Sequence, residues 1–246
     1  MTTNETMTTH KTAARIFGVF FLISFLTYAS GSALIDSIVS APDMLANVYA
    51  NQTLLVVAAL LMAVIHTCTN IGLPVTLLRV LKPHNETLYV GYLSAAIVAT
   101  VSLAIGVIFL LVLLPLSDAY MRSGSASPEQ FATMAILLRK VNFFSYNLGM
   151  VMWSVGGLLF CAILYQAKLI PRFMSVWGAV GYVVFLSGCM LELFGLDLSS
   201  MHTLPGAVFE IGLSGWLIVK GFNASVITSE SAKTDSNERQ RALSAT

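Results

Sequence analysis

Charged residues are scarce in this chain of 246 residues, and their scarcity excludes several classes of protein. Asp, Glu, Lys and Arg make up 10% of the sequence, whereas about a quarter of a typical soluble domain is charged. Hydrophobic residues make up 57%, and the mean hydropathy is +0.80. This composition excludes an ordinary soluble domain, a disordered chain and a nucleic-acid binder that relies on a basic patch. It indicates an integral membrane protein with several transmembrane spans, and we therefore expect the lipid bilayer to be a partner of this chain.

Cysteine is also scarce, with single residues at positions 68, 161 and 189, each inside an apolar run. An odd number at these spacings fits neither a disulfide framework nor a zinc site. We therefore expect three buried free thiols. The Walker, dinucleotide and G-x-S-x-G motifs are also missing from the sequence. The sequence thus predicts no cofactor and no metal, and it assigns no catalytic residue.

The long apolar runs predict an all-α fold, a polytopic bundle of six transmembrane helices. A transmembrane helix needs about 20 mainly apolar residues. The expected membrane domain covers residues 13–223, and the polar segments 1–12 and 228–246 are expected to be disordered tails. The six spans run roughly over residues 16–35, 54–78, 88–116, 141–165, 173–194 and 204–222.

The first apolar run has a competing interpretation as a secretory signal peptide. Lys11 and Arg15 form a charged start, and Gly31-Ser32-Ala33 offers small residues for cleavage. The apolar stretch continues to Ile35, which favours an uncleaved helix.

The distribution of Lys and Arg predicts the orientation in the cell (cytoplasmic) membrane, because cytoplasmic loops are enriched in these residues. In a six-span arrangement ten of them lie on one side and three on the other, so both termini are expected to be cytoplasmic. The ten are Lys11, Arg15, Arg79, Lys82, Lys168, Arg172, Lys220, Lys233, Arg239 and Arg241, and the three are Arg122, Arg139 and Lys140.

Two loops carry helix-start signals. Ser127-Pro128-Glu129-Gln130 matches a capping box, which predicts a helix that begins near Pro128 and runs into the fourth span. Ser40-Ala41-Pro42-Asp43 is a second signal, followed by apolar residues at helical spacing over 44–49. We expect the second helix to lie on the outer surface, with its apolar face in lipid and its body over the cavity inferred below.

Three sequence stretches resemble a bacterial family of multi-pass membrane proteins, domain of unknown function 4386. They are Lys11-Thr-Ala-Ala-Arg-Ile-Phe-Gly18, the segment Tyr165–Gly178 with its Pro-Arg-Phe-x-Ser-x-Trp-Gly pattern, and Glu210 followed by Trp216-Leu-Ile-Val-Lys-Gly-Phe222. The likeness spans roughly Lys11 to Asn223. It implies a multi-pass protein of the bacterial inner membrane, but it implies no reaction, no ligand and no catalytic residue.

Polar residues recur at helical spacing inside the expected spans, and each ionisable one is a functional-site hypothesis because its burial in lipid is costly. Most of the ionisable groups fall in the outer half of the bilayer, which predicts a polar cavity that opens to the outside. Within it Glu210 is expected to pair with Arg139, or else with Lys140. The candidate cluster is Glu210, His66, Asn70, Arg139, Asn142, Tyr28, Asp36 and Glu192.

These residues leave three functional hypotheses open. The leading one is non-enzymatic: a small-molecule or lipid-like ligand binds in the cavity or passes through it. The second is a membrane-embedded enzyme, with or without a metal ion, that uses Glu210 and His66. His66-Thr-Cys-Thr-Asn70 matches one motif of intramembrane CAAX-protease-like families, but their paired-glutamate motif is missing. The third is a structural or partner subunit in which the cluster only holds helices together. The sequence indicates no oligomeric state.

Overall fold

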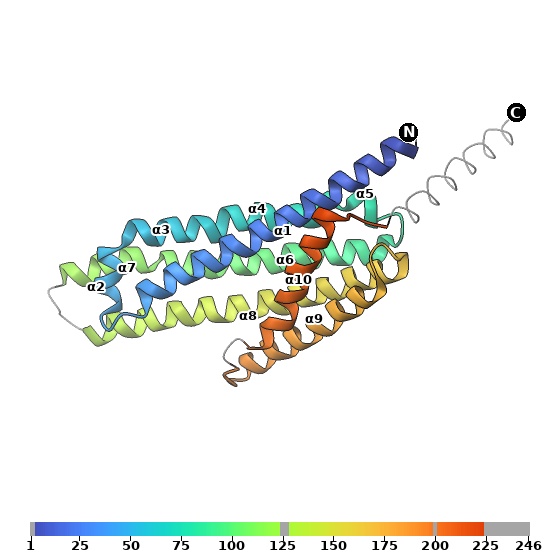
Figure 1. The fold of residues 1–246 in the computed structure, drawn as a ribbon. Coiled ribbons are helices and arrows are strands. Elements are labelled where there is room, and N and C mark those ends of the chain that lie inside the picture. The colour runs from blue at the N-terminus through green and yellow to red at the C-terminus, as the bar shows by residue number, and fades with distance from the viewer. Residues whose placement is uncertain (1–2, 124–127, 199–200, 224–246) are drawn as a thin grey trace, which may run out of the picture.

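The protein folds into a bundle of helices, and a computed structural model describes residues 3–123, 128–198 and 201–223 (Figure 1). No strand occurs in these ranges, so the predicted all-α class is confirmed. The helices are α1 (Thr3–Val39), α2 (Met44–Ala50), α3 (Gln52–Leu60), the π-helix η1 (Leu61–Ile65), α4 (His66–Thr76), α5 (Leu78–Leu81), α6 (Glu86–Leu111), α7 (Leu113–Arg122), α8 (Pro128–Ala167), α9 (Arg172–Leu193), the 3₁₀ turn η2 (Met201–Thr203) and α10 (Leu204–Val219).

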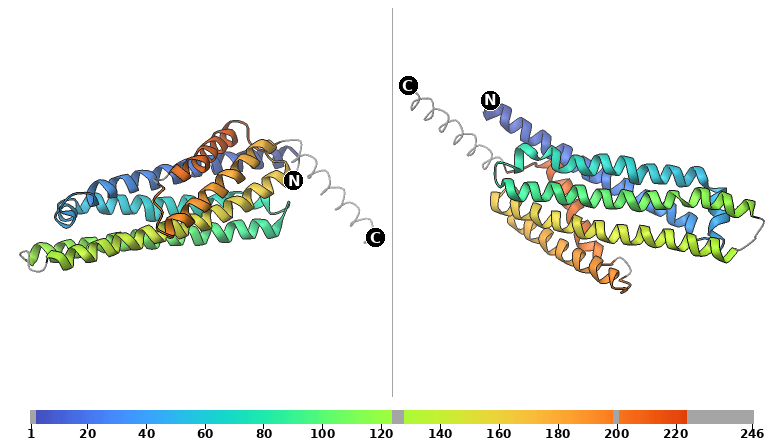
Figure 2. Two further views of the ribbon diagram at one scale, coloured as in Figure 1. Left: turned by 90° about the horizontal axis from the view of Figure 1, so that it is seen from below. Right: turned by 180° about the vertical axis from the view of Figure 1, so that it is seen from behind.

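Five helical stretches are long and apolar enough to cross a membrane: Thr8–Val39, Gln52–Leu81, Glu86–Arg122, Pro128–Ala167 and Arg172–Leu193. They correspond to the first five expected spans. The sixth expected span contains α10, which has 16 residues and crosses the bundle obliquely beside α1 and α9 (Figures 1 and 2). A straight helix of that length is about 24 Å long, shorter than the roughly 30 Å hydrocarbon core.

The structure describes most of one predicted tail and none of the other. Residues 3–12, expected to be part of a disordered tail, are helical and continue α1 toward the N-terminus. The polar composition of this segment predicted the opposite, but a helix that is already nucleated extends at little further cost. The segment 228–246 lies outside the described residues.

The predicted helix start near Pro128 is confirmed, because α8 begins there and continues to Ala167 without a break. Its 40 residues make it about 60 Å long, roughly twice the thickness of the hydrocarbon core. The N-terminal part of α8 lies beside α7, at the end of the bundle where α2 also lies (Figure 1). Arg139 lies in that part, eleven positions after Pro128.

The short helix α2 forms where it was predicted, but its surroundings differ from the prediction. The Asp43 carboxylate accepts a hydrogen bond from the Ala46 amide at 3.1 Å and caps the helix. Leu45 and Val48, expected to face lipid, are buried in a cluster formed with α1, α3, α6 and α7. No α2 residue lines the cavity described below. The apolar face of α2 is therefore covered by protein, and α2 is not a cover for the cavity.

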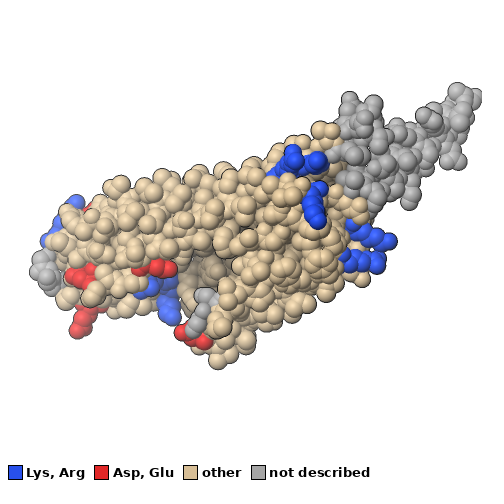
Figure 3. Space-filling view, in the orientation of Figure 1, with Lys and Arg blue, Asp and Glu red and all other residues tan. Residues whose placement is uncertain are grey.

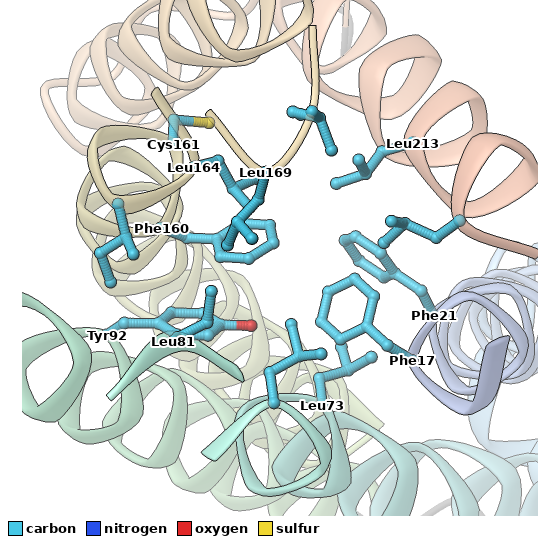
Figure 4. Close-up of a cluster of buried hydrophobic side chains, with 14 of the residues drawn as sticks. Phe17, Phe21, Leu73, Leu81, Tyr92, Phe160, Cys161, Leu164, Leu169 and Leu213 are labelled. Atoms are coloured by element: carbon cyan, nitrogen blue, oxygen red, sulfur yellow. The ribbon is translucent and has the colours of Figure 1, made fainter. Parts of the chain in front are cut away.

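Two hydrophobic clusters hold the bundle together. The larger one lies toward the end where α1 begins, and Figure 4 shows Phe17, Phe21 and Phe160 pointing toward one another in its centre. The Phe17 ring centroid is 5.5 Å from that of Phe21 and 5.5 Å from that of Phe160. The smaller cluster joins α1, α2, α3, α6 and α7 toward the opposite end. Two of the three cysteines, Cys161 and Cys189, are buried as expected, whereas Cys68 is exposed on the surface of α4.

Candidate functional site

A cavity of about 710 Å³ lies among α1, α4, α6, α8, α9 and α10, and its wall includes members of both hydrophobic clusters. The molecular surface is hollowed beside a group of acidic and basic side chains (Figure 3). Ligand sites commonly have volumes of roughly 300–1,000 Å³. This cavity is therefore large enough for a small molecule or for part of a lipid.

Seven of the eight candidate residues line this one cavity, although they come from four helices far apart in the sequence. The seven are Tyr28 and Asp36 on α1, His66 and Asn70 on α4, Arg139 and Asn142 on α8, and Glu210 on α10. The eighth, Glu192, does not line it.

Glu210 is held by two neutral donors from two other helices. The Trp153 indole Nε1 on α8 donates to Glu210 Oε1 at 2.9 Å, and the Tyr182 hydroxyl on α9 donates to the same oxygen at 3.0 Å. Both hydrogen bonds reach Oε1, and no protein donor within the described ranges reaches Oε2. The carboxyl group therefore joins three helices and keeps one oxygen for another partner.

The expected pair between Glu210 and Arg139 is wrong. Trp153, which contacts Glu210, follows Arg139 by fourteen positions on α8, a separation of roughly 21 Å along the helix axis. An arginine side chain cannot bridge that distance. The prediction failed because α10 meets α8 at Trp153, past the middle of the 40 residues of α8, rather than near its N-terminal end. Arg139 instead interacts electrostatically with Asp36, and both residues line the cavity.

His66 is the first residue after the π-helical turn η1, a distortion that often occurs at functional sites. Its Nδ1 lies 3.1 Å from the backbone oxygen of Ser24 and 3.0 Å from the Ser24 hydroxyl oxygen. The backbone oxygen can only accept, and the Ser24 hydroxyl proton is directed to Asn70 Oδ1 at 3.2 Å. We therefore assign the imidazole proton to Nδ1.

This tautomer leaves Nε2 of a neutral His66 with a free lone pair. Nε2 is buried and has no hydrogen-bond partner in the part of the chain that the structure describes. The imidazole ring packs against Tyr28, with 4.9 Å between ring centroids, and Tyr28 in turn stacks on Tyr146 at 6.0 Å. The arrangement offers a hydrogen-bond acceptor next to an aromatic wall of the cavity.

Asn70 extends the polar network away from the cavity and into α6. Its Nδ2 donates to the Thr100 hydroxyl at 2.7 Å, and that hydroxyl donates to the Ala96 carbonyl at 2.7 Å. Each of these side-chain groups has a partner, so the network fixes the positions of α1, α4 and α6 around the cavity.

Glu192 belongs to a separate buried group at the end of α9. Its carboxylate lies 3.8 Å from Nδ1 of His202, and Nε2 of His202 lies 3.7 Å from Cys189 Sγ. A Cβ added at Gly188 would collide with the His202 ring, so glycine is needed at that position for the ring to pack there. The group connects η2 to α9.

Sequence reasoning missed Trp153 and Tyr182, which position Glu210, and it missed the π-helical turn before His66. A usable signal existed for Trp153: it follows Tyr146 by seven positions, which places both on one face of α8. A tryptophan N–H inside a span also needs an acceptor. Within the described ranges no group of three or more His, Cys, Asp or Glu side chains is arranged to hold a metal ion.

Comparison with known proteins gives one match. The model of a family described as "Domain of unknown function (DUF4386)" matches residues 16–221, which confirms the resemblance seen in the sequence. No curated protein matches the chain. No solved structure matches it either.

Proposed function

Because the chain belongs to the DUF4386 family, whose description gives no activity, we propose a function from the cavity itself: the protein binds or passes a small or lipid-like ligand between its helices. One observation carries this proposal. Seven polar side chains from four helices converge on a single cavity of about 710 Å³ inside an apolar bundle. Polar groups within membrane helices are costly to bury, so their convergence supports a binding role.

The chemistry of the wall fits an amphipathic occupant. Glu210, Asn142 and the buried His66 provide polar contacts, while Phe21, Trp153 and other aromatic residues provide apolar surface. Ligand pockets typically combine a mainly apolar lining with a few polar groups that fix orientation.

We also propose that the chain crosses the cell (cytoplasmic) membrane of a bacterium six times, with both termini in the cytoplasm. The sixth crossing would use α10, which is short but tilted against α1 and α9. In support, Lys and Arg side chains gather at the end of the bundle where α1 begins (Figure 3). Under this orientation the cavity opens toward the outside.

Ligand binding can be tested with the neutral fluorescent probe 1,6-diphenyl-1,3,5-hexatriene. The protein has three tryptophans, and the double variant Trp177→Phe, Trp216→Phe leaves Trp153, which lines the cavity, as the only energy donor. With this variant purified in an uncharged detergent, we expect energy transfer from Trp153 to the probe that saturates with probe concentration.

Two substitutions at neighbouring positions of α10 compare a side chain inside the cavity with one on the outer surface. Ala207 lines the cavity, and Ala207→Phe should fill it and abolish the saturable transfer. Val208 is 52% exposed on the outer surface of the same helix, and Val208→Phe should leave the transfer unchanged. Equal transfer in all three proteins would place the probe in the detergent alone and would contradict the proposal.

A further inference from the structure

Glu210 has no cationic partner in the described part of the chain. Its two hydrogen bonds come from Trp153 and Tyr182, which are neutral donors. Apart from His66, the only basic side chain of the cavity wall within the described residues is Arg139, and it interacts with Asp36 near the C-terminal end of α1. Lys140 lies over the Phe143 ring, 5.5 Å from its centroid, and does not line the cavity.

The charges of the wall therefore do not cancel. Asp36 and Arg139 offset each other, and we take His66 as neutral because a second N–H, at its buried Nε2, would have no acceptor in the described residues. The carboxyl group of Glu210 is then the one wall group, among the described residues, whose charge would have no counterpart, and the bundle around it is apolar. An ionised carboxylate in such a place is costly unless a positive charge or further hydrogen bonds compensate it.

Aromatic side chains line the cavity together with the carboxyl group. Trp153 packs edge-on against Phe21, with 6.0 Å between ring centroids, and both line the cavity together with Phe185. Aromatic faces attract cations, and quaternary ammonium ligands are recognised by several aromatic side chains together. A carboxylate on the same wall adds a charge of opposite sign to the cation.

We propose that the ligand carries a positively charged amine or quaternary ammonium group that pairs with Oε2 of Glu210, while its apolar part lies along the aromatic wall toward the mouth of the cavity. This inference rests on the proposed ligand-binding function and names the chemical class of the ligand. Both sources of such a ligand, a free organic cation and a lipid with a cationic headgroup, share the chemistry that Glu210 would recognise.

Three probes of almost the same shape separate the effect of charge from the effect of the cavity. They are neutral diphenylhexatriene, its trimethylammonium derivative and its propionate derivative, each titrated against the variant in which Trp153 is the only tryptophan. We expect the cationic probe to bind roughly tenfold more tightly than the neutral one, as one added charge-assisted contact allows. The anionic probe should bind most weakly.

Glu210→Gln, made in the same background, should remove the preference and bring the cationic and neutral probes to similar affinity. Glutamine keeps an oxygen that can accept from Trp153 and Tyr182, so the helices stay joined. Glu192→Gln is the matched control, because Glu192 lies outside the cavity, and it should keep the preference. If Glu210→Gln fails to fold, the relative affinities of the three probes for the protein that retains Glu210 still test the inference.

The outcomes are distinguishable. Saturable binding of all three probes with equal affinity would overturn the inference and would leave the proposed ligand-binding function standing. Tightest binding of the anionic probe would also overturn it and would identify Arg139 as the recognising charge. If no probe binds saturably, the proposed function itself fails.

Discussion

The indole nitrogen of Trp153 donates a hydrogen bond to Oε1 of Glu210 at 2.9 Å, and this contact joins α8 to α10 at the wall of the cavity. Tyr182 adds a second donor from α9 to the same oxygen. The carboxyl group therefore has two separable roles. Oε1 holds three helices together, and Oε2 is the oxygen that we propose pairs with the ligand.

The first role predicts different stabilities for two substitutions of Glu210. Glu210→Gln retains an acceptor for both donors and should change the free energy of unfolding little. Glu210→Leu leaves the Trp153 N–H and the Tyr182 hydroxyl without a partner, at a cost of roughly 1–3 kcal/mol for each buried group. Thermal unfolding in a mild detergent measures the difference, and equal melting temperatures of the two variants would show that Oε1 has no structural role.

The position of Tyr182 depends on a glycine of α8. A Cβ added at Gly157 would collide with the Tyr182 ring, whereas one added at Gly215 would meet no atom within 4 Å. Gly157→Ala should therefore displace Tyr182 from Glu210 and destabilise the bundle by about 1–3 kcal/mol.

Gly215→Ala is the matched control on α10. It should be neutral or stabilising, because alanine favours a helix over glycine by up to about 1 kcal/mol. If both variants melt at the same temperature, the close packing of Gly157 against Tyr182 is not present in the protein.

The contact between Asn70 and Thr100 should appear as a coupling energy between α4 and α6. Their side chains are 2.7 Å apart, and both are buried. Double-mutant cycles in membrane proteins give about 0.6 kcal/mol for such hydrogen bonds, so Asn70→Ala and Thr100→Val should be coupled by about that amount. Ser102 bonds only within its own helix, and a cycle of Asn70→Ala with Ser102→Ala should show no coupling. Coupling of equal size in both cycles would argue against a specific contact.

The proposed topology predicts the side of the membrane on which each loop lies. Reporter fusions at Lys82, Lys168 and Asn223 should report the cytoplasm, and fusions at Gln52 and Leu196 should report the outside. The decisive comparison is between Leu196 and Asn223, which flank α10. If both report the same side, α10 does not cross, and the chain has five spans rather than six.

The helical fold was predictable because membrane helices are apolar along their whole length, and this signal needs no knowledge of packing. The start of α8 at Pro128 was predictable from a local capping pattern. Two other features were not predictable. Residues 3–12 are polar and yet helical, and the short α2 is amphipathic and yet buried by protein rather than by lipid. In both cases neighbouring structure outweighed the local composition.

The convergence of polar residues was predictable to the extent that helical spacing places them on one face, as with Ser24, Tyr28 and Asp36. The pairing of those faces was not, because it depends on the lengths and tilts of helices. The short α10 meets the long α8 at Trp153 and not near Arg139. Trp153 therefore contacts Glu210 where Arg139 was expected to do so. Glu192 was assigned to the cavity from its depth alone, whereas its side chain turns toward His202.

The most direct test of a cationic ligand in this cavity is a structure of the protein in lipid nanodiscs, determined by electron cryo-microscopy with the trimethylammonium derivative of diphenylhexatriene at saturation. The account predicts density for the probe inside the cavity, with its trimethylammonium group beside Glu210 and its polyene along Trp153 and Tyr146. Density for the probe only on the lipid-facing surface, with side chains filling the space beside Glu210, would contradict it.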